Sequence, residues 1–125
     1  MKPVGTHILA DLWGVGRVVL DDIPALRAAI TEAASAAGLH VLDTRFHKFV
    51  PQGVTGYVML SESHISIHTW PESGTAALDV FTCGDGRAGE RACHGIIERL
   101  GALKHRISAH ERGGIAPPGS DRMEG

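Results

Sequence analysis

The chain of 125 residues alternates between two hydrophobic periods, which predict two helices and six strands. Apolar residues recur at helical spacing after Asp21 or Asp22, either of which can cap a helix, and Pro24 suits its first turn. Gly38 is expected to end this helix in a left-handed conformation. A second amphipathic helix is predicted over residues 87–104. Strand-like runs are predicted over residues 4–13, 39–49, 53–60, 64–70, 75–81 and 106–111.

This order of elements favours one α+β domain spanning residues 1–125. Consecutive strands joined by short turns favour an antiparallel sheet, and two helices can cover one of its faces. We therefore expect a two-layer sandwich, with a mainly antiparallel sheet and both helices on the same side. The tail at residues 113–125 has no apolar period and is expected to be mobile.

The predicted strand at residues 64–70 has two different faces, because side chains alternate along a strand. Ile65, Ile67 and Thr69 share the face expected to point at the helices. The opposite face carries His64, Ser66, His68 and Trp70. Such a polar and aromatic face is either solvated or covered by another subunit, and Trp70 favours the covered state.

Composition narrows the class of protein. A net charge of -2 gives no basic footprint for nucleic acid. No apolar stretch approaches the roughly 20 residues that cross a bilayer, and the first residues lack the apolar run of a secretory signal. The two cysteines, Cys83 and Cys93, do not make a disulfide framework. We therefore expect a reduced, cytoplasmic protein that binds neither membranes nor nucleic acid.

The run at residues 60–72, followed by residues 79–84, gathers a hydroxyl, carboxylates, imidazoles and a thiol. Covalent chemistry on a carbonyl uses groups of these types. The Glu62–Ser63 bond is the candidate cleavage site, because the Ser63 hydroxyl can attack the Glu62 carbonyl and exchange the amide for an ester. Loss of the Ser63 α-proton then expels the Glu62 carboxylate, and hydrolysis leaves a pyruvoyl group.

The string at residues 61–72 with 79–84 closely resembles the motif of the bacterial and archaeal S-adenosylmethionine decarboxylases. Further matching residues lie at 5–7, 46–54 and 110–113. The resemblance implies that the chain cleaves itself into a β chain of residues 1–62 and an α chain of residues 63–125. Ser63 becomes the pyruvoyl cofactor, so no metal is implied.

The resemblance also implies roles for the processing residues. His68 matches the histidine that moves protons during self-cleavage, and Cys83 matches the proton donor of the decarboxylation. The second processing hydroxyl of the family, usually a serine, falls on Thr55. Threonine keeps the hydroxyl but adds a methyl group and stiffens the first side-chain torsion. We expect the function to survive, with self-cleavage that is slower or that needs a slightly different backbone.

Two further residues match the family's substrate contacts. Phe49 corresponds to the aromatic ring that stacks on adenine and faces the sulfonium charge. Glu72 corresponds to the carboxylate that holds the ribose hydroxyls. The resemblance implies that the substrate amine forms a Schiff base with the pyruvoyl group, which acts as the electron sink. The decarboxylated product is the aminopropyl donor for spermidine synthesis.

Strand geometry separates Ser63 from His68. Five residues of extended chain cover about 16 Å at roughly 3.3 Å per residue, and the two positions face opposite sides of a regular strand. Either the chain bends sharply or His68 serves the Ser63 of a partner, and we favour the partner. The hypothesis is a homodimer in which Ser63 and Cys83 of one protomer face the second protomer's substrate and processing residues. These are Phe49, Thr55, His68 and Glu72.

Three alternatives remain beside this interpretation. A pyruvoyl decarboxylase of another amino acid, such as arginine or ornithine, could use the same scaffold, although Phe49 and Glu72 favour a nucleoside. A non-catalytic binding module is disfavoured because Ser63, His68 and Cys83 are all present. His64 and His68 have the spacing of a zinc-binding pair on a helix, but the alternation here predicts a strand.

Overall fold

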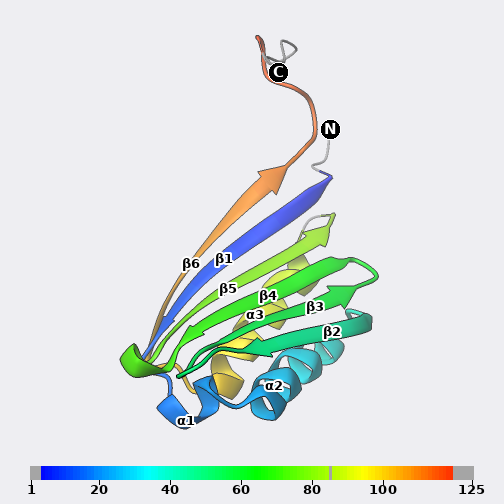
Figure 1. Ribbon diagram of the computed structural model, residues 1–125. Helices are drawn as coiled ribbons and strands as arrows, with labels where there is room; N and C mark the ends of the chain where they lie inside the picture. Colours follow the sequence, from blue (N-terminus) through cyan, green and yellow to red (C-terminus); the bar gives the residue numbers. More distant parts are fainter. Residues whose placement is uncertain (1–3, 85, 120–125) are drawn as a thin grey trace.

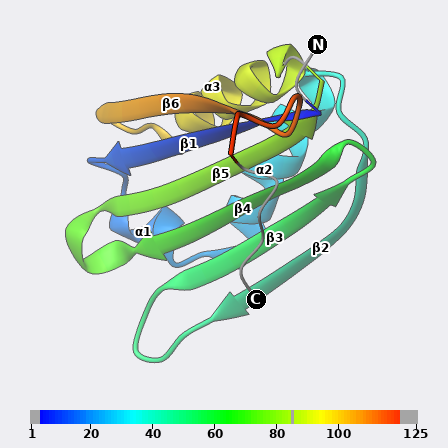
Figure 2. The same cartoon turned by 90° about the horizontal axis from the view of Figure 1, so that it is seen from above.

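The computed structural model describes residues 4–84 and 86–119, and within them the chain folds into two layers. One layer is a six-stranded, wholly antiparallel sheet with the order β2-β3-β4-β5-β1-β6. The helices lie against one face of it (Figures 1 and 2). The strands are β1 (Gly5–Trp13), β2 (Val41–Lys48), β3 (Val54–Leu60), β4 (Ser63–Trp70), β5 (Thr75–Cys83) and β6 (Lys104–Arg112). The predicted α+β sandwich is confirmed.

Two long helices, α2 (Ile23–Ala36) and α3 (Arg87–Leu100), make up most of the second layer. Asp22 caps α2 by accepting a hydrogen bond from the Ala25 N–H at 3.2 Å, and Gly38 follows its end with φ +89°, both as predicted. The prediction that the second helix reaches residue 104 is wrong. The helix ends at Leu100 because Gly101 adopts φ +70° and closes it.

Two short helices were not predicted from the sequence. They are α1 (Arg17–Leu20) and the 3-10 helix η1 (Pro71–Ser73). Each is too short to show a hydrophobic period. Both lie at the same end of the sheet, where α1 contacts η1.

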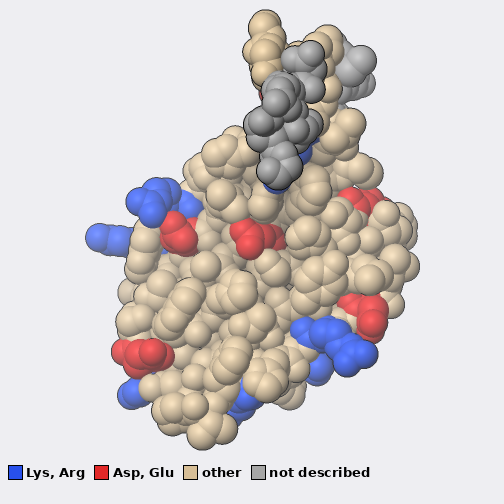
Figure 3. All heavy atoms as spheres, turned by 45° about the horizontal axis from the view of Figure 1, so that its top comes forward, with Lys and Arg blue, Asp and Glu red and all other residues tan. Residues whose placement is uncertain are grey.

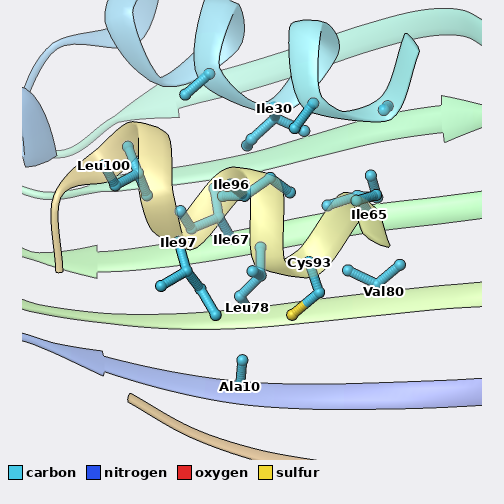
Figure 4. Packing of buried hydrophobic residues seen from close by; sticks show 14 of the residues in the cluster. Ala10, Ile30, Ile65, Ile67, Leu78, Val80, Cys93, Ile96, Ile97 and Leu100 are labelled. Carbon is cyan, nitrogen blue, oxygen red and sulfur yellow. The ribbon is translucent and has the colours of Figure 1, made fainter. Parts of the chain in front are cut away.

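The core lies between the sheet and the helices. Ile65 and Ile67 of β4 are fully buried, which confirms the predicted inward face of this strand. Figure 4 shows Ile96 and Ile97 of α3 packed over the strands. The two helices approach closely at Gly95, where an added Cβ would lie 3.1 Å from the Ala33 Cβ of α2.

The sheet face turned away from the helices, here called the open face, is partly apolar. Lys, Arg, Asp and Glu are sparse over its middle (Figure 3). The large side chains exposed on it, between 37% and 47% of their surface, are Leu9, Trp13, Phe49, Tyr57, Met59 and Trp70. Exposed apolar area of this kind on a small domain is typical of a surface that another molecule covers.

The remaining boundaries differ from the predictions by a few residues. β2 is shorter than the predicted run at 39–49, and β6 is longer than the run at 106–111. The predicted tail at 113–125 has no helix or strand up to residue 119, and residues 120–125 lie outside the described part. No helix among the described residues has the length and hydropathy needed to span a membrane.

Candidate active site

The candidate cleavage bond lies at a tight hairpin between β3 and β4. Leu60 pairs with Ser63 across the hairpin, so Ser61 and Glu62 form a two-residue turn. Ser63 has φ 144°, the one positive value of a non-glycine residue in the described chain. Side chains at positive φ clash with the backbone, at a cost of about 1–3 kcal/mol. The peptide bond predicted to break therefore precedes a strained residue.

A hydrogen bond holds the scissile carbonyl. The Cys83 N–H donates to the Glu62 carbonyl oxygen at 3.0 Å, which connects the turn to the end of β5. A donor at this oxygen polarises the carbonyl and stabilises negative charge that develops on it. Cys83 lies one position beyond Thr82, the pairing partner of Ser63, and it is exposed. Ser63 and Cys83 thus lie together, although 20 positions separate them in the sequence.

The Glu62 side chain is also held. Its carboxylate accepts a hydrogen bond from the His40 N–H at 3.1 Å and lies 2.7 Å from the His40 Nδ1. In return the Ser61 N–H donates to the His40 carbonyl oxygen at 2.9 Å. The two hydrogen bonds between His40 and the Glu62 carboxylate, above all the one with the His40 ring, lower the pKa of Glu62 to about 2. His40 therefore clamps the turn from the segment before β2.

A second group of predicted residues lies on the open face at the other end of β4. Thr55 and His68 form a cross-strand pair, with 3.1 Å between the Thr55 Oγ1 and the His68 Nδ1. They line a pocket of about 250 Å³. The other side chains of this pocket, here called the edge pocket, include Phe49, Gln52, Trp70 and Glu72. The structure thus brings together the two residues matched to substrate binding, Phe49 and Glu72, and the two matched to processing, Thr55 and His68.

The two groups do not meet within one chain. Ser63 begins β4 and His68 lies five residues along it, about 16 Å away at roughly 3.3 Å per residue. β4 runs without interruption from Ser63 to Trp70, so no sharp bend brings them together. The chain therefore carries these two groups of candidate residues, here called the half-sites, at opposite ends of the same strand.

The loop that carries Phe49 has anchors that sequence reasoning missed. The Asp21 carboxylate accepts a hydrogen bond from the Gly53 N–H at 2.9 Å and lies 3.3 Å from the Lys48 Nζ. The bond from Gly53 is the main reason that the pKa of Asp21 is lowered. The Phe49 N–H closes the loop by donating to the Gly53 carbonyl oxygen at 2.8 Å. No local pattern could reveal Asp21, because its partner lies 32 positions away.

His64 and His68 are the pair whose spacing matches that of zinc ligands on a helix. They lie on one strand, four positions apart, as the alternation predicted. Among the residues that the structure describes, no group of three or more His, Cys, Asp and Glu side chains could hold an ion. His64 instead contacts Ser63, with 3.2 Å between the Nδ1 and the Ser63 Oγ.

Comparisons with known proteins agree along most of the chain. A family model described as S-adenosylmethionine decarboxylase matches residues 6–113. A protein from Prochlorococcus marinus (strain MIT 9211), named S-adenosylmethionine decarboxylase proenzyme, is 48% identical over 109 residues, covering 87% of this chain and 89% of the relative. The protein of the same name from Moorella thermoacetica is 44% identical over 118 residues, 94% of each chain.

A solved structure gives the same answer for the fold. The crystal structure of the adenosylmethionine decarboxylase from Aquifex aeolicus VF5 superposes with a TM-score of 0.85 at 42% sequence identity. The match covers 98% of this chain and 100% of that one. The resemblance predicted from the sequence is confirmed: the chain belongs to the S-adenosylmethionine decarboxylase family.

Proposed function

We propose that this chain is a self-processing, pyruvoyl-dependent decarboxylase of S-adenosylmethionine, and that it releases CO2 and the aminopropyl donor for spermidine synthesis. The observation that carries the proposal is the Glu62–Ser63 bond itself. Its carbonyl oxygen accepts a hydrogen bond from the Cys83 N–H, and its serine is held at φ 144°. The relatives named above, which carry the word proenzyme, support the same activity.

Self-cleavage begins with attack by the Ser63 Oγ on the Glu62 carbonyl carbon. The Cys83 N–H stabilises the oxyanion. Conversion of the amide to the ester is favoured because it releases the backbone strain at Ser63. The C–N bond breaks, the nitrogen takes a proton, and an ester remains. Removal of the Ser63 α-proton forms a Cα–Cβ double bond and expels the Glu62 carboxylate. Hydrolysis of this dehydroalanine releases ammonia and leaves a pyruvoyl group at residue 63.

The residues around Ser63 fit this group. When formed, it supplies the electron sink that decarboxylation of an amino acid requires. The exposed thiol of Cys83, next to Ser63 in the sheet, is suited to return a proton to the substrate carbon. In the edge pocket, Phe49 offers an aromatic face to adenine and to the sulfonium charge, and Glu72 offers a carboxylate to the ribose hydroxyls.

We further propose that the active site is shared between two protomers. His68 and Thr55 lie too far from Ser63 of their own chain to act on it, and the open face between the half-sites is partly apolar. An isologous pairing of two open faces would bring each Ser63 to the partner's edge pocket and create two equivalent sites. Free thiols at Cys83 and Cys93 support a cytoplasmic location for this dimer.

The rival substrates are arginine and ornithine. A basic amino acid has neither adenine for Phe49 nor ribose for Glu72, and the relatives reported above are named for S-adenosylmethionine. Measuring CO2 release from all three carboxyl-labelled substrates separates the alternatives. Release from arginine or ornithine but not from S-adenosylmethionine would overturn the proposed substrate.

The mass of the purified chain tests self-processing. The expected products are residues 1–62, ending in a free carboxylate, and residues 63–125, lighter by one ammonia than simple hydrolysis would leave them. The Ser63→Ala chain is the control and stays whole. Wild-type chain that stays whole after prolonged incubation, and does not react with a hydrazine at residue 63, would overturn the proposal. The non-catalytic binding module would then be the remaining alternative.

Co-expression of two inactive chains tests the shared site. In a mixed dimer of Ser63→Ala and His68→Ala chains, one site combines the intact Ser63 with the intact His68. The His68→Ala chain should therefore be cleaved while the Ser63→Ala chain is not. If neither chain is cleaved in a mixture shown to contain mixed dimers, the site is not shared in trans.

A further inference from the structure

His64 is the imidazole nearest to the reacting hydroxyl in the described structure. Its Nδ1 lies 3.2 Å from the Ser63 Oγ, within hydrogen-bond reach of the nucleophile itself. His68 lies about 16 Å from Ser63 along the same strand, at roughly 3.3 Å per residue. With the ring proton on Nε2, the His64 Nδ1 has a free lone pair and the Ser63 hydroxyl donates to it. A general base must lie at this distance from the proton that it removes.

Two aromatic rings hold the His64 ring in place from the neighbouring strands. Tyr57 of β3 stacks on it, with centroids 5.4 Å apart and an interplanar angle of 20°. Phe81 of β5 lies edge-on to it, with centroids 5.8 Å apart. His64 is itself partly buried on the open face. The imidazole is therefore fixed against the serine, as a catalytic group needs to be.

We propose that His64 is the general base of the first step of self-cleavage, an inference that rests on the proposed function. The His64 Nδ1 takes the proton of the Ser63 hydroxyl as the Oγ bonds to the Glu62 carbonyl carbon. As the C–N bond breaks, the same proton passes from His64 to the departing nitrogen of Ser63. The step ends with an ester, a free amine and a neutral imidazole. His68, from the partner, is left for the later removal of the α-proton.

Substitution of His64 separates proton transfer from simple positioning. His64→Asn keeps a hydrogen-bonding amide near the Nδ1 position but cannot take a proton at neutral pH, whereas His64→Ala leaves space for added imidazole. Self-cleavage, followed by intact mass, should slow about 100-fold or more in both variants. Imidazole should restore part of the rate in His64→Ala. His105→Gln, an exposed histidine of β6, is the control and should cleave like the wild type.

Hydroxylamine identifies the step that is lost, because it cuts an ester but not an amide. Incubated with hydroxylamine for the time in which the wild type is fully processed, the His64→Asn chain should stay largely whole, since the ester forms too slowly to be cut. Cleavage of His64→Asn at the wild-type rate overturns the role of His64 but leaves the proposed function intact. Accumulation of a hydroxylamine-sensitive ester in His64→Asn also overturns it, because His64 would then act after the acyl shift. A wild-type chain that never cleaves overturns the proposed function instead.

Discussion

The strain at Ser63 can be measured by comparing two chains that cannot cleave themselves, Ser63→Gly and Ser63→Ala. Alanine retains the Cβ that clashes at φ 144°, at a cost of about 1–3 kcal/mol, and glycine removes it. Glycine also gains more freedom in the unfolded chain, which costs about 0.5–1 kcal/mol. Ser63→Gly should therefore be more stable than Ser63→Ala by about 1 kcal/mol, within a range of about 0–2.5 kcal/mol, which corresponds to a rise in Tm of about 4 °C for a chain of this length.

Thermal or denaturant unfolding of both variants at equal protein concentration measures the difference. The same pair of substitutions at Ser66, made in the Ser63→Ala chain so that it too cannot cleave itself, is the matched control, because Ser66 lies in the same strand without positive φ. There the order should reverse, with Ser66→Ala the more stable because glycine weakens a strand interior. A Ser63→Gly chain no more stable than Ser63→Ala would refute the argument that the cleavage site stores backbone strain.

Three further outcomes are expected. Burial, and to a lesser extent the charge of Glu90, raises the pKa of Cys93 to about 12. A small thiol reagent at neutral pH should therefore label the exposed Cys83 and abolish decarboxylation. Labelling of Cys93 at a similar rate in the folded protein would contradict this. Because the folded pKa of Glu62 lies below its ordinary value of 4.5, its contacts stabilise the fold above about pH 4.5 and lose this effect as the pH falls through about 2. NMR titration of the Ser63→Ala chain should show the low pKa of Glu62, and an added His40→Ala substitution should raise that pKa. A Glu62 pKa that His40→Ala leaves unchanged would exclude the clamp. Asp21→Ala should loosen the Phe49 loop and raise the KM for S-adenosylmethionine by up to about tenfold without slowing self-cleavage. Initial rates measure the KM and intact mass measures self-cleavage, with Asp43→Ala, a substitution of an exposed residue, as the control. An unchanged KM would show that the loop needs no anchor at Asp21.

Much of the candidate site could be predicted because its motif is nearly continuous in the sequence. The alternation through β4 placed Ile65 and Ile67 inward and His64 and His68 on the open face, and the structure agrees. The rise per residue of a strand was enough to separate Ser63 from His68. The predicted helix ran beyond the true end of α3. The sequence shows a glycine at position 101 but not its backbone angles, and only those angles distinguish a glycine that ends a helix from one inside it. The roles of His40, Asp21 and His64 depend on contacts that no periodicity reports.

The sequence by itself determined the fold class, the two faces of the strand at residues 64–70 and the groups available for chemistry, because side-chain alternation and helical periodicity are local properties. Only the tertiary structure decided that β1 lies between β5 and β6, and that the Cys83 N–H meets the Glu62 carbonyl. Strand order and register are set by hydrogen bonds and packing between segments far apart in the chain. The strained backbone of Ser63 and the ring beside its hydroxyl are products of that assembly.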